Sequence, residues 1–165
     1  MKMNNLYIKQ VPGKGRCVFS KKDIKTGEIV ETAPVIIISG NLYDLPEKHE
    51  YRINGVNELV RLKEVKSDSI ILPQQIANVT FNWSNLINDG KKDQCIALGY
   101  GSLYSSNNPA NMKYEADEKN LNLLFIAVVD IPKNTELTVN YSGINGSHIS
   151  KDNNWFTNRK IDFIE

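Results

Sequence analysis

The chain alternates short apolar runs with clusters of turn residues along most of its length. The runs are rich in β-branched and aromatic residues, and glycine, proline, asparagine and aspartate bound them, as is typical of strands joined by turns. The pattern predicts a mostly β protein of several small sheets with few short helices. The predicted strands span residues 6–11, 17–20, 28–32, 35–39, 79–83, 94–98, 111–115, 121–129 and 136–140.

Two polar turns share one pattern. In residues 23–28 and again in residues 130–136, an Asp-Ile pair enters the turn and a glutamate begins the next strand. Nothing else in the chain matches at this interval, so the similarity indicates one turn chemistry used twice and not an internal repeat.

Composition narrows the class of protein. The chain has 165 residues, the size of one domain, and 20 Lys and Arg against 19 Asp and Glu give a formal net charge of +1. This balance provides no basic excess for direct nucleic-acid binding. The longest apolar runs are too short to span a bilayer, and the first residues lack the apolar stretch of a signal peptide. We therefore expect a single domain over residues 1–165, located in the cytoplasm, with no membrane partner.

The two cysteines offer neither a zinc quartet nor a disulfide framework. Cys17 and Cys95 are the two cysteines, and neither has a neighbouring histidine in a nucleophile pattern. His49 and His148 lie in polar, loop-like contexts that favour a surface position. We expect no metal.

Three segments carry the most informative residue patterns. Residues 13–20 read Gly-Lys-Gly-Arg-Cys-Val-Phe-Ser, residues 98–111 read Leu-Gly-Tyr-Gly-Ser-Leu-Tyr-Ser-Ser-Asn-Asn-Pro-Ala-Asn, and residues 136–141 read Glu-Leu-Thr-Val-Asn-Tyr. The glycines of the central segment indicate a tight passage of the backbone. Taken alone, a glycine in a strand more often marks a bulge than a ligand site.

In this order, the three segments resemble the SET-domain protein-lysine methyltransferases, over about residues 6–157. The chain is similar to small members without cysteine-rich zinc segments before or after the domain. The resemblance implies a β-clip-like fold with knot-like threading near the C-terminus, S-adenosylmethionine as methyl donor and a lysine-containing protein or peptide as substrate. It also implies a variable insert at about 40–78, a post-SET-like segment at about 142–165, a nuclear location in a eukaryotic host and a possible homodimer.

Lysine methylation requires a neutral amine held in line with the methyl group, and an apolar channel lined by tyrosine favours the uncharged form. By resemblance, Tyr141 is the catalytic tyrosine and Tyr114 lines the lysine channel. The alternative for both is a tyrosine packed in the core.

By the same resemblance, the methyl donor would contact Gly15, Arg16, Cys17, Tyr104, Ser105, Ser106 and Trp155. Trp155-Phe156 resembles the aromatic pair that packs over the adenine in the family, with Trp155 against the adenine. Two positions depart from the family pattern. Cys17 stands in place of a glycine, and Ser105-Ser106 replace an Asn-His pair that positions the amino group of the donor. Each lost hydrogen bond to a charged group costs on the order of 1.5–3 kcal/mol. The departures leave a second reading open, a SET-fold protein-binding module that has lost donor binding.

Overall fold

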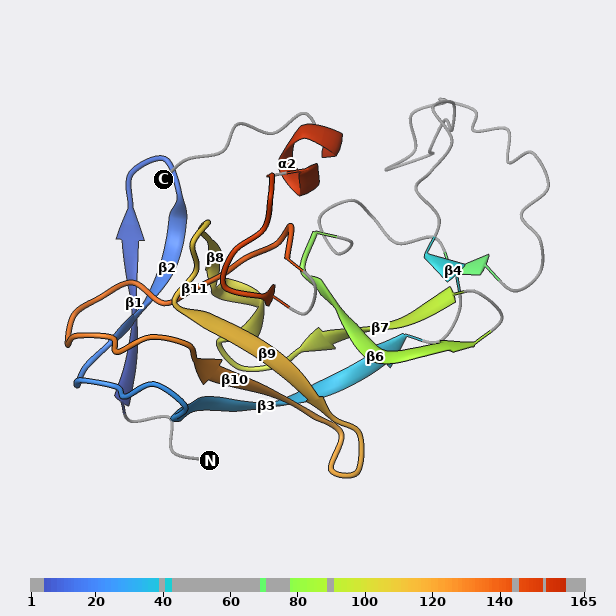
Figure 1. Cartoon of the computed structure of the whole chain (residues 1–165), viewed down its shortest axis with the longest axis horizontal. Coiled ribbons are helices and arrows are strands. Elements are labelled where there is room, and N and C mark those ends of the chain that lie inside the picture. Colours follow the sequence, from blue (N-terminus) through green and yellow to red (C-terminus); the bar gives the residue numbers. More distant parts are fainter. Residues whose placement is uncertain are drawn as a thin grey trace, which may run out of the picture.

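Strands account for most of the regular structure in the computed structural model (Figure 1). The structure describes residues 5–38, 41–42, 69–70, 78–88, 91–143, 146–152 and 154–159. The strands are β1 (Leu6–Val11), β2 (Gly15–Ser20), β3 (Ile29–Ile38), β4 (Asn41–Leu42), β5 (Ser69–Ile70), β6 (Thr80–Asn88), β7 (Lys91–Ala97), β8 (Ser105–Ser106), β9 (Met112–Asp117), β10 (Asn122–Ala127) and β11 (Thr138–Val139). The helices are a 3-10 turn, η2 (Gly101–Leu103), and α2 (Asn154–Arg159).

The strands form one larger sheet and three small pairs. The five-stranded sheet has the order β6-β7-β3-β10-β9 with all neighbours antiparallel, and β1 pairs with β2 as an antiparallel hairpin. β8 pairs with β11, and β4 pairs with β5, both in parallel. The hairpin lies on the opposite side of the molecule from β6 and β7 (Figure 1). The prediction of a mostly β fold of small sheets is confirmed.

The two strands predicted at 28–32 and 35–39 are a single strand, β3, and that part of the prediction was wrong. The N-terminal half of β3 pairs with β10, and its C-terminal half pairs with β7. Pro34, which suggested a break, lies where the pairing changes from one neighbour to the other, and its carbonyl accepts a hydrogen bond from Leu98 N at 2.8 Å. A proline is tolerated there because a missing N–H costs least where a ladder ends.

The core lies between the five-stranded sheet and the segments that cross it. On β10, Leu123, Phe125 and Ala127 are buried while the intervening residues are half-buried, which is the two-residue period of a strand with one face in the core. Met112 and Tyr114 of β9 lie on the same buried face. Phe125 is central, because its ring contacts the rings of Phe81, Tyr104 and Tyr114.

The two similar turns pack against each other. Ile24 and Ile131 exchange both backbone hydrogen bonds at 2.8 Å. Each turn's aspartate accepts a hydrogen bond from the other turn: Asp130 from Thr26 N at 2.9 Å, and Asp23 from Lys133 N at 2.8 Å. The shared pattern in the sequence thus corresponds to a reciprocal contact in space.

Residues 135–139 run between β2 and β8. Leu137 N donates to Val18 O at 2.8 Å on one side, while Thr138 pairs with Ser105 on the other. The strand predicted at 136–140 is accordingly shorter, because only β11 finds a parallel partner. The tight passage predicted for the central segment contains β8, a strand that the sequence pattern did not predict.

The predicted insert at about 40–78 falls mostly outside the described residues. Within it, β4 and β5 pair with each other. The post-SET-like segment at 142–165 is described only in part, up to residue 159. Both boundaries stay predictions. Within the described residues, no helix combines the length and apolar character that a membrane crossing needs.

The contact between the two turns predicts a specific loss of stability in acid. The ion pair with Lys25, followed by hydrogen bonds from Thr26, lowers the pKa of Asp130 from its ordinary 3.8 to about 2. Because the folded state holds this proton less tightly than the unfolded state, the contribution is present above pH about 4 and is lost as pH falls toward about 2. We expect the difference in Tm between wild type and Asp130→Asn to shrink over that window.

Thermal unfolding followed by circular dichroism from pH 6 to pH 2 measures this difference. Asp117→Asn is the matched control, since its carboxylate accepts hydrogen bonds from the nearby Asn120 within the same exposed turn. A difference for Asp130→Asn that stays constant across the window would contradict the prediction.

Candidate active site

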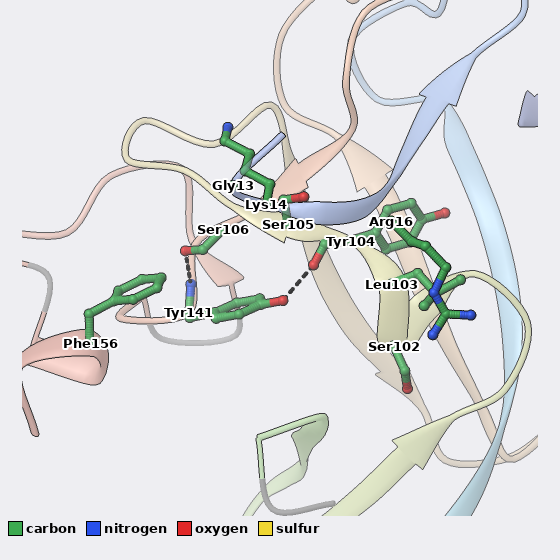
Figure 2. A pocket seen from close by; sticks show the side chains of 10 residues that line it. All are labelled: Gly13, Lys14, Arg16, Ser102, Leu103, Tyr104, Ser105, Ser106, Tyr141 and Phe156. Carbon is green, nitrogen blue, oxygen red and sulfur yellow. Dashed lines mark hydrogen bonds between the residues drawn. The ribbon is translucent and has the colours of Figure 1, made fainter. Parts of the chain in front are cut away.

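Among the described residues, a first cavity has a volume of about 360 Å³. It lies between the β1–β2 turn, η2, β8 and the C-terminal segment (Figure 2). A site of this size matches the range of small-molecule and cofactor pockets. Its lining residues are Gly13, Lys14, Arg16, Ser102, Leu103, Tyr104, Ser105, Ser106, Tyr141 and Phe156.

The second cavity is much smaller, about 50 Å³. Such a volume suits one unbranched side chain better than a cofactor. Every lining side chain is uncharged at neutral pH, and several are aromatic. The lining residues are Asn78, Val79, Thr80, Phe81, Ser102, Tyr114, Val139, Asn140, Tyr141 and Trp155. Tyr141 and Ser102 line both cavities.

Tyr141 is held from both its backbone and its side chain. Its hydroxyl donates to Tyr104 O at 2.5 Å, and its backbone N–H donates to Ser106 Oγ at 3.2 Å (Figure 2). Its ring makes an edge contact with Trp155, with centroids 4.8 Å apart, and stacks nearly parallel to Phe156 at 6.1 Å. Burial, and to a lesser degree Cys17, raises the pKa of Tyr141 to about 12, so the phenol is neutral at physiological pH.

Tyr114 reaches the second cavity from β9. It is 7% exposed, and its ring meets Phe81 edge-on with centroids 5.1 Å apart. Burial raises its pKa to about 12 despite a hydrogen bond with the backbone of Asn82. The backbone at Gly146 passes so close that an added Cβ would lie 2.7 Å from the Tyr114 ring. Tyr114 is therefore both a core residue and a lining residue, and the two alternatives posed by the sequence are compatible.

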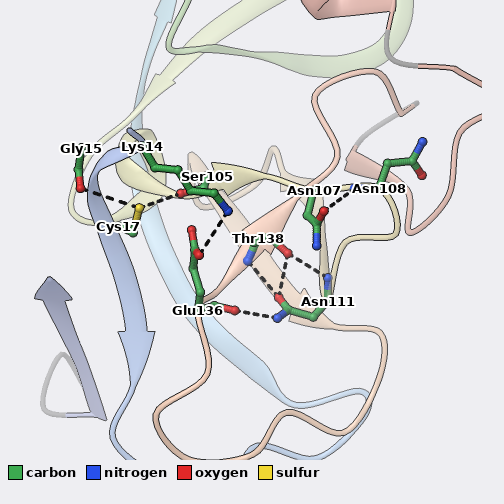
Figure 3. A network of polar contacts seen from close by, with 9 residues as sticks. All are labelled: Lys14, Gly15, Cys17, Ser105, Asn107, Asn108, Asn111, Glu136 and Thr138. Atoms are coloured by element: carbon green, nitrogen blue, oxygen red, sulfur yellow. Dashed lines mark hydrogen bonds and ion pairs between the residues drawn. The ribbon is translucent and has the colours of Figure 1, made fainter. Parts of the chain in front are cut away.

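Two cations line the first cavity. Lys14 and Arg16 both border it, and Lys14 Nζ lies 3.5 Å from Glu136 Oε2 (Figure 3). Glu136 is not a lining residue, so the charge that faces the cavity is positive. Such a surface suits an anionic group such as a carboxylate.

Cys17 and Ser105, two of the residues that depart from the family pattern, contact each other. Ser105 Oγ donates to the Cys17 thiol at 3.2 Å (Figure 3). Cys17 is fully buried, and burial raises the pKa of its thiol. It lies in β2 opposite Lys9 without positive φ, so a side chain is tolerated there; positive φ falls on Gly13 and Gly15 instead. The glycine-to-cysteine departure therefore imposes no strain on the backbone.

The predicted site residues divide between the cavities. Arg16, Tyr104, Ser105, Ser106 and Tyr141 line the first cavity. Tyr114 and Trp155 line the second, together with Tyr141. Gly15 and Cys17 are neighbours of lining residues without lining either cavity.

Trp155, which the resemblance assigns to the donor, lines the second cavity and not the first. The next residue, Phe156, lines the first cavity, because successive residues of α2 point in different directions. Sequence reasoning also missed Lys14, Ser102 and Leu103 as lining residues. Their only signal was their place inside the two glycine-containing segments. Among the described residues, no His, Cys, Asp or Glu side chains gather in the threes that could hold a metal ion.

A cavity of cofactor size and a small cavity with an uncharged lining share Tyr141. The family model of the SET domain matches residues 15–142, and the chain belongs to this family. The chain is 26% identical over 151 residues to "Histone-lysine N-methyltransferase, H3 lysine-37 specific" of Schizosaccharomyces pombe, covering 92% of this chain and 76% of that protein.

A solved structure of a Plasmodium falciparum protein, described as a candidate histone methyltransferase, has the same fold. The TM-score is 0.53 at 20% identity, over 85% of this chain and 95% of that one. The family and the relative establish the activity: this protein is a protein-lysine N-methyltransferase that uses S-adenosylmethionine. The reading as a binding module without catalysis is not favoured.

The contact between Ser105 and Cys17 predicts that the two positions are coupled in size. Ser105→Asn places a larger side chain against a fully buried thiol and should lower the free energy of unfolding by about 1–3 kcal/mol. Cys17→Ala removes the sulfur, so Cys17→Ala/Ser105→Asn should be more stable than the two single changes together predict. Urea unfolding of all four proteins gives the coupling energy. Strict additivity would contradict the prediction, because it would mean that the longer side chain turns away from Cys17.

Proposed function

We propose that the two cavities are the donor end and the acceptor end of one methyl-transfer path, with Tyr141 at their junction. The observation that carries the proposal is that Tyr141 and Ser102 line both cavities. A transfer between two bound groups requires such a meeting point, since positioning supplies up to roughly 7–11 kcal/mol of the barrier.

At the donor end, the chemistry of the lining residues fits S-adenosylmethionine. Arg16 and Lys14 are suited to its carboxylate, and the Phe156 ring offers an apolar face for adenine. Ser105 and Ser106 contribute hydroxyl and backbone groups in place of longer side chains. When bound, S-adenosylmethionine supplies an electrophilic methyl group.

At the acceptor end, the neutral lining favours the uncharged amine, and the proton that the lysine loses goes to solvent water. Burial of a lysine amine among uncharged side chains disfavours the ammonium form and lowers the pKa of that lysine. Tyr141 and Tyr114 support this role, because phenols with a pKa of about 12 remain neutral. The Tyr141 hydroxyl donates its hydrogen bond to Tyr104 O, so the lone pairs of its oxygen are left to accept a hydrogen bond from the amine.

For the substrate protein, we propose a histone, since the Schizosaccharomyces pombe relative is named for a histone lysine. A histone substrate would place the protein in the nucleus of a eukaryotic host.

We further propose a homodimer, supported by exposed apolar side chains at Ile36, Leu98 and Leu121, around the point where β3 changes partners. Sedimentation velocity tests the homodimer, which a concentration-independent monomer would rule out.

Tyr141→Phe tests the central proposal. The change removes the hydroxyl and keeps the ring contacts, so donor binding should stay within about twofold of wild type. A lost transition-state hydrogen bond of about 1.5–3 kcal/mol corresponds to a kcat that is roughly tenfold to 150-fold lower. Methyl transfer from radiolabelled donor to histone and non-histone lysine peptides measures kcat, and calorimetry measures Kd. Tyr7→Phe, on β1, is the control. Wild-type turnover by Tyr141→Phe would overturn the proposal.

Phe156→Ala and Trp155→Ala form a matched pair that separates the two cavities. Phe156→Ala should raise the Kd for S-adenosylmethionine by roughly tenfold, as expected for loss of an aromatic face worth about 1–3 kcal/mol per base. Trp155→Ala should leave that Kd nearly unchanged and raise the KM for the peptide. The opposite ranking of the two Kd values would return Trp155 to the donor site.

A further inference from the structure

Glu31 is a buried carboxylate that the reaction described above does not use. It lies on β3 and is 7% exposed. Its Oε1 accepts a hydrogen bond from Tyr100 N at 2.9 Å, and its Oε2 accepts one from the Tyr104 hydroxyl at 2.7 Å. Among the described residues, no cation forms a salt bridge with it.

Burial of the Glu31 carboxylate costs free energy of folding. Burial raises the pKa of Glu31, and the hydrogen bonds from Tyr104 and Tyr100 offset that effect only in part. A buried charge without a counter-charge destabilises a fold, and an apolar or neutral residue of similar size is often as stable or more so. Stability of the fold therefore gives no reason for a glutamate at this position.

The two hydrogen bonds tie both ends of η2 to β3. Tyr100 precedes η2 and Tyr104 follows it, so one carboxylate spans the whole turn. Between them Gly101 packs so closely that an added Cβ would lie 2.5 Å from Ala97 Cβ. The Tyr104 ring is 1% exposed and packs against Phe125, with centroids 4.8 Å apart. The turn is held on both sides.

The backbone of Tyr104 links the hydrogen bonds of Glu31 to Tyr141. Tyr104 O accepts the hydrogen bond from the Tyr141 hydroxyl, with the two oxygens 2.5 Å apart. Tyr104 also lines the donor cavity, as do Ser102 and Leu103 of η2. A shift of the turn would move this carbonyl and, with it, the direction of the Tyr141 hydroxyl.

We propose that Glu31 is a positioning residue for methyl transfer, which fixes the η2 turn so that Tyr104 O orients Tyr141. Glu31 lines neither cavity, so it acts only through Tyr104 and Tyr141. The inference rests on the role proposed above for Tyr141, and it adds a requirement that the cavities alone do not reveal.

Glu31→Gln is the first variant. It keeps the shape of the side chain but removes the charge and one acceptor. We expect a Tm at neutral pH equal to or above that of wild type, and a kcat lower by roughly tenfold to a hundredfold, as for a small misplacement of reacting groups. The Kd for S-adenosylmethionine and the peptide KM should stay within about twofold. Glu115→Gln, an exposed glutamate on β9, is the control and should change none of these.

Tyr104→Phe provides a second route, because it removes the hydroxyl partner of Glu31 and keeps the carbonyl that contacts Tyr141. It should lower kcat as Glu31→Gln does, and Glu31→Gln/Tyr104→Phe should be no slower than the slower single variant. In a Tyr141→Phe background, Glu31→Gln should have no further effect on kcat. This non-additivity is a readout that a merely structural role would not produce.

The outcomes separate this inference from the proposed function. If Tyr141→Phe is fully active, the proposed function fails. If Tyr141→Phe is slow but folded Glu31→Gln and Tyr104→Phe both turn over at the wild-type rate, only the role of Glu31 fails. The role also fails if the loss of kcat in both variants merely follows the loss of folded protein. Multiplicative effects of Glu31→Gln and Tyr141→Phe would likewise overturn it.

Discussion

The site depends on the path of residues 135–139 between β2 and β8. Asn111 holds this path, since its side chain donates to Glu136 O at 2.7 Å and accepts from Thr138 N at 2.8 Å (Figure 3). The parallel pairing of β8 with β11 is only two residues long, so these side-chain bonds supply what a longer ladder would provide elsewhere. Tyr141 follows directly after, and its place between the cavities is a consequence of this path.

The two cavities differ in the charge of the side chains that line them. Positive side chains border the first cavity, the proposed donor end, whereas neutral groups line the second cavity, the proposed acceptor end. A carboxylate in the proposed acceptor cavity would stabilise the ammonium form of a substrate lysine, so a lining without carboxylates favours the neutral, reactive amine. Glu31 stands apart from both ends. Its carboxylate accepts hydrogen bonds from Tyr100 and Tyr104, which flank η2, and it lines neither cavity.

The departures from the family pattern are partly resolved by the structure. Cys17 occupies an ordinary strand position, and its thiol contacts Ser105. Ser106 gains a role of its own, because its hydroxyl accepts the backbone N–H of Tyr141. The short side chains at 105 and 106 are therefore integrated into the packing around Tyr141. This integration agrees with membership of an active enzyme family and removes one motive for the reading as a degenerate module.

Local patterns in the sequence determined the class of fold, because alternation on strands such as β10 and the glycines of the turns are encoded by neighbouring residues. The three ordered segments also predicted the family, and most of the residues expected at the site line one of the two cavities. Contacts between distant segments were decided only in the tertiary structure: β3 runs through Pro34 because it changes partners there, and the two similar turns bind each other. Trp155 and Phe156 line different cavities for the same reason. The direction that each face of a short helix takes is set by the segments it packs against, so the sequence alone does not decide which of two neighbouring residues lines which cavity.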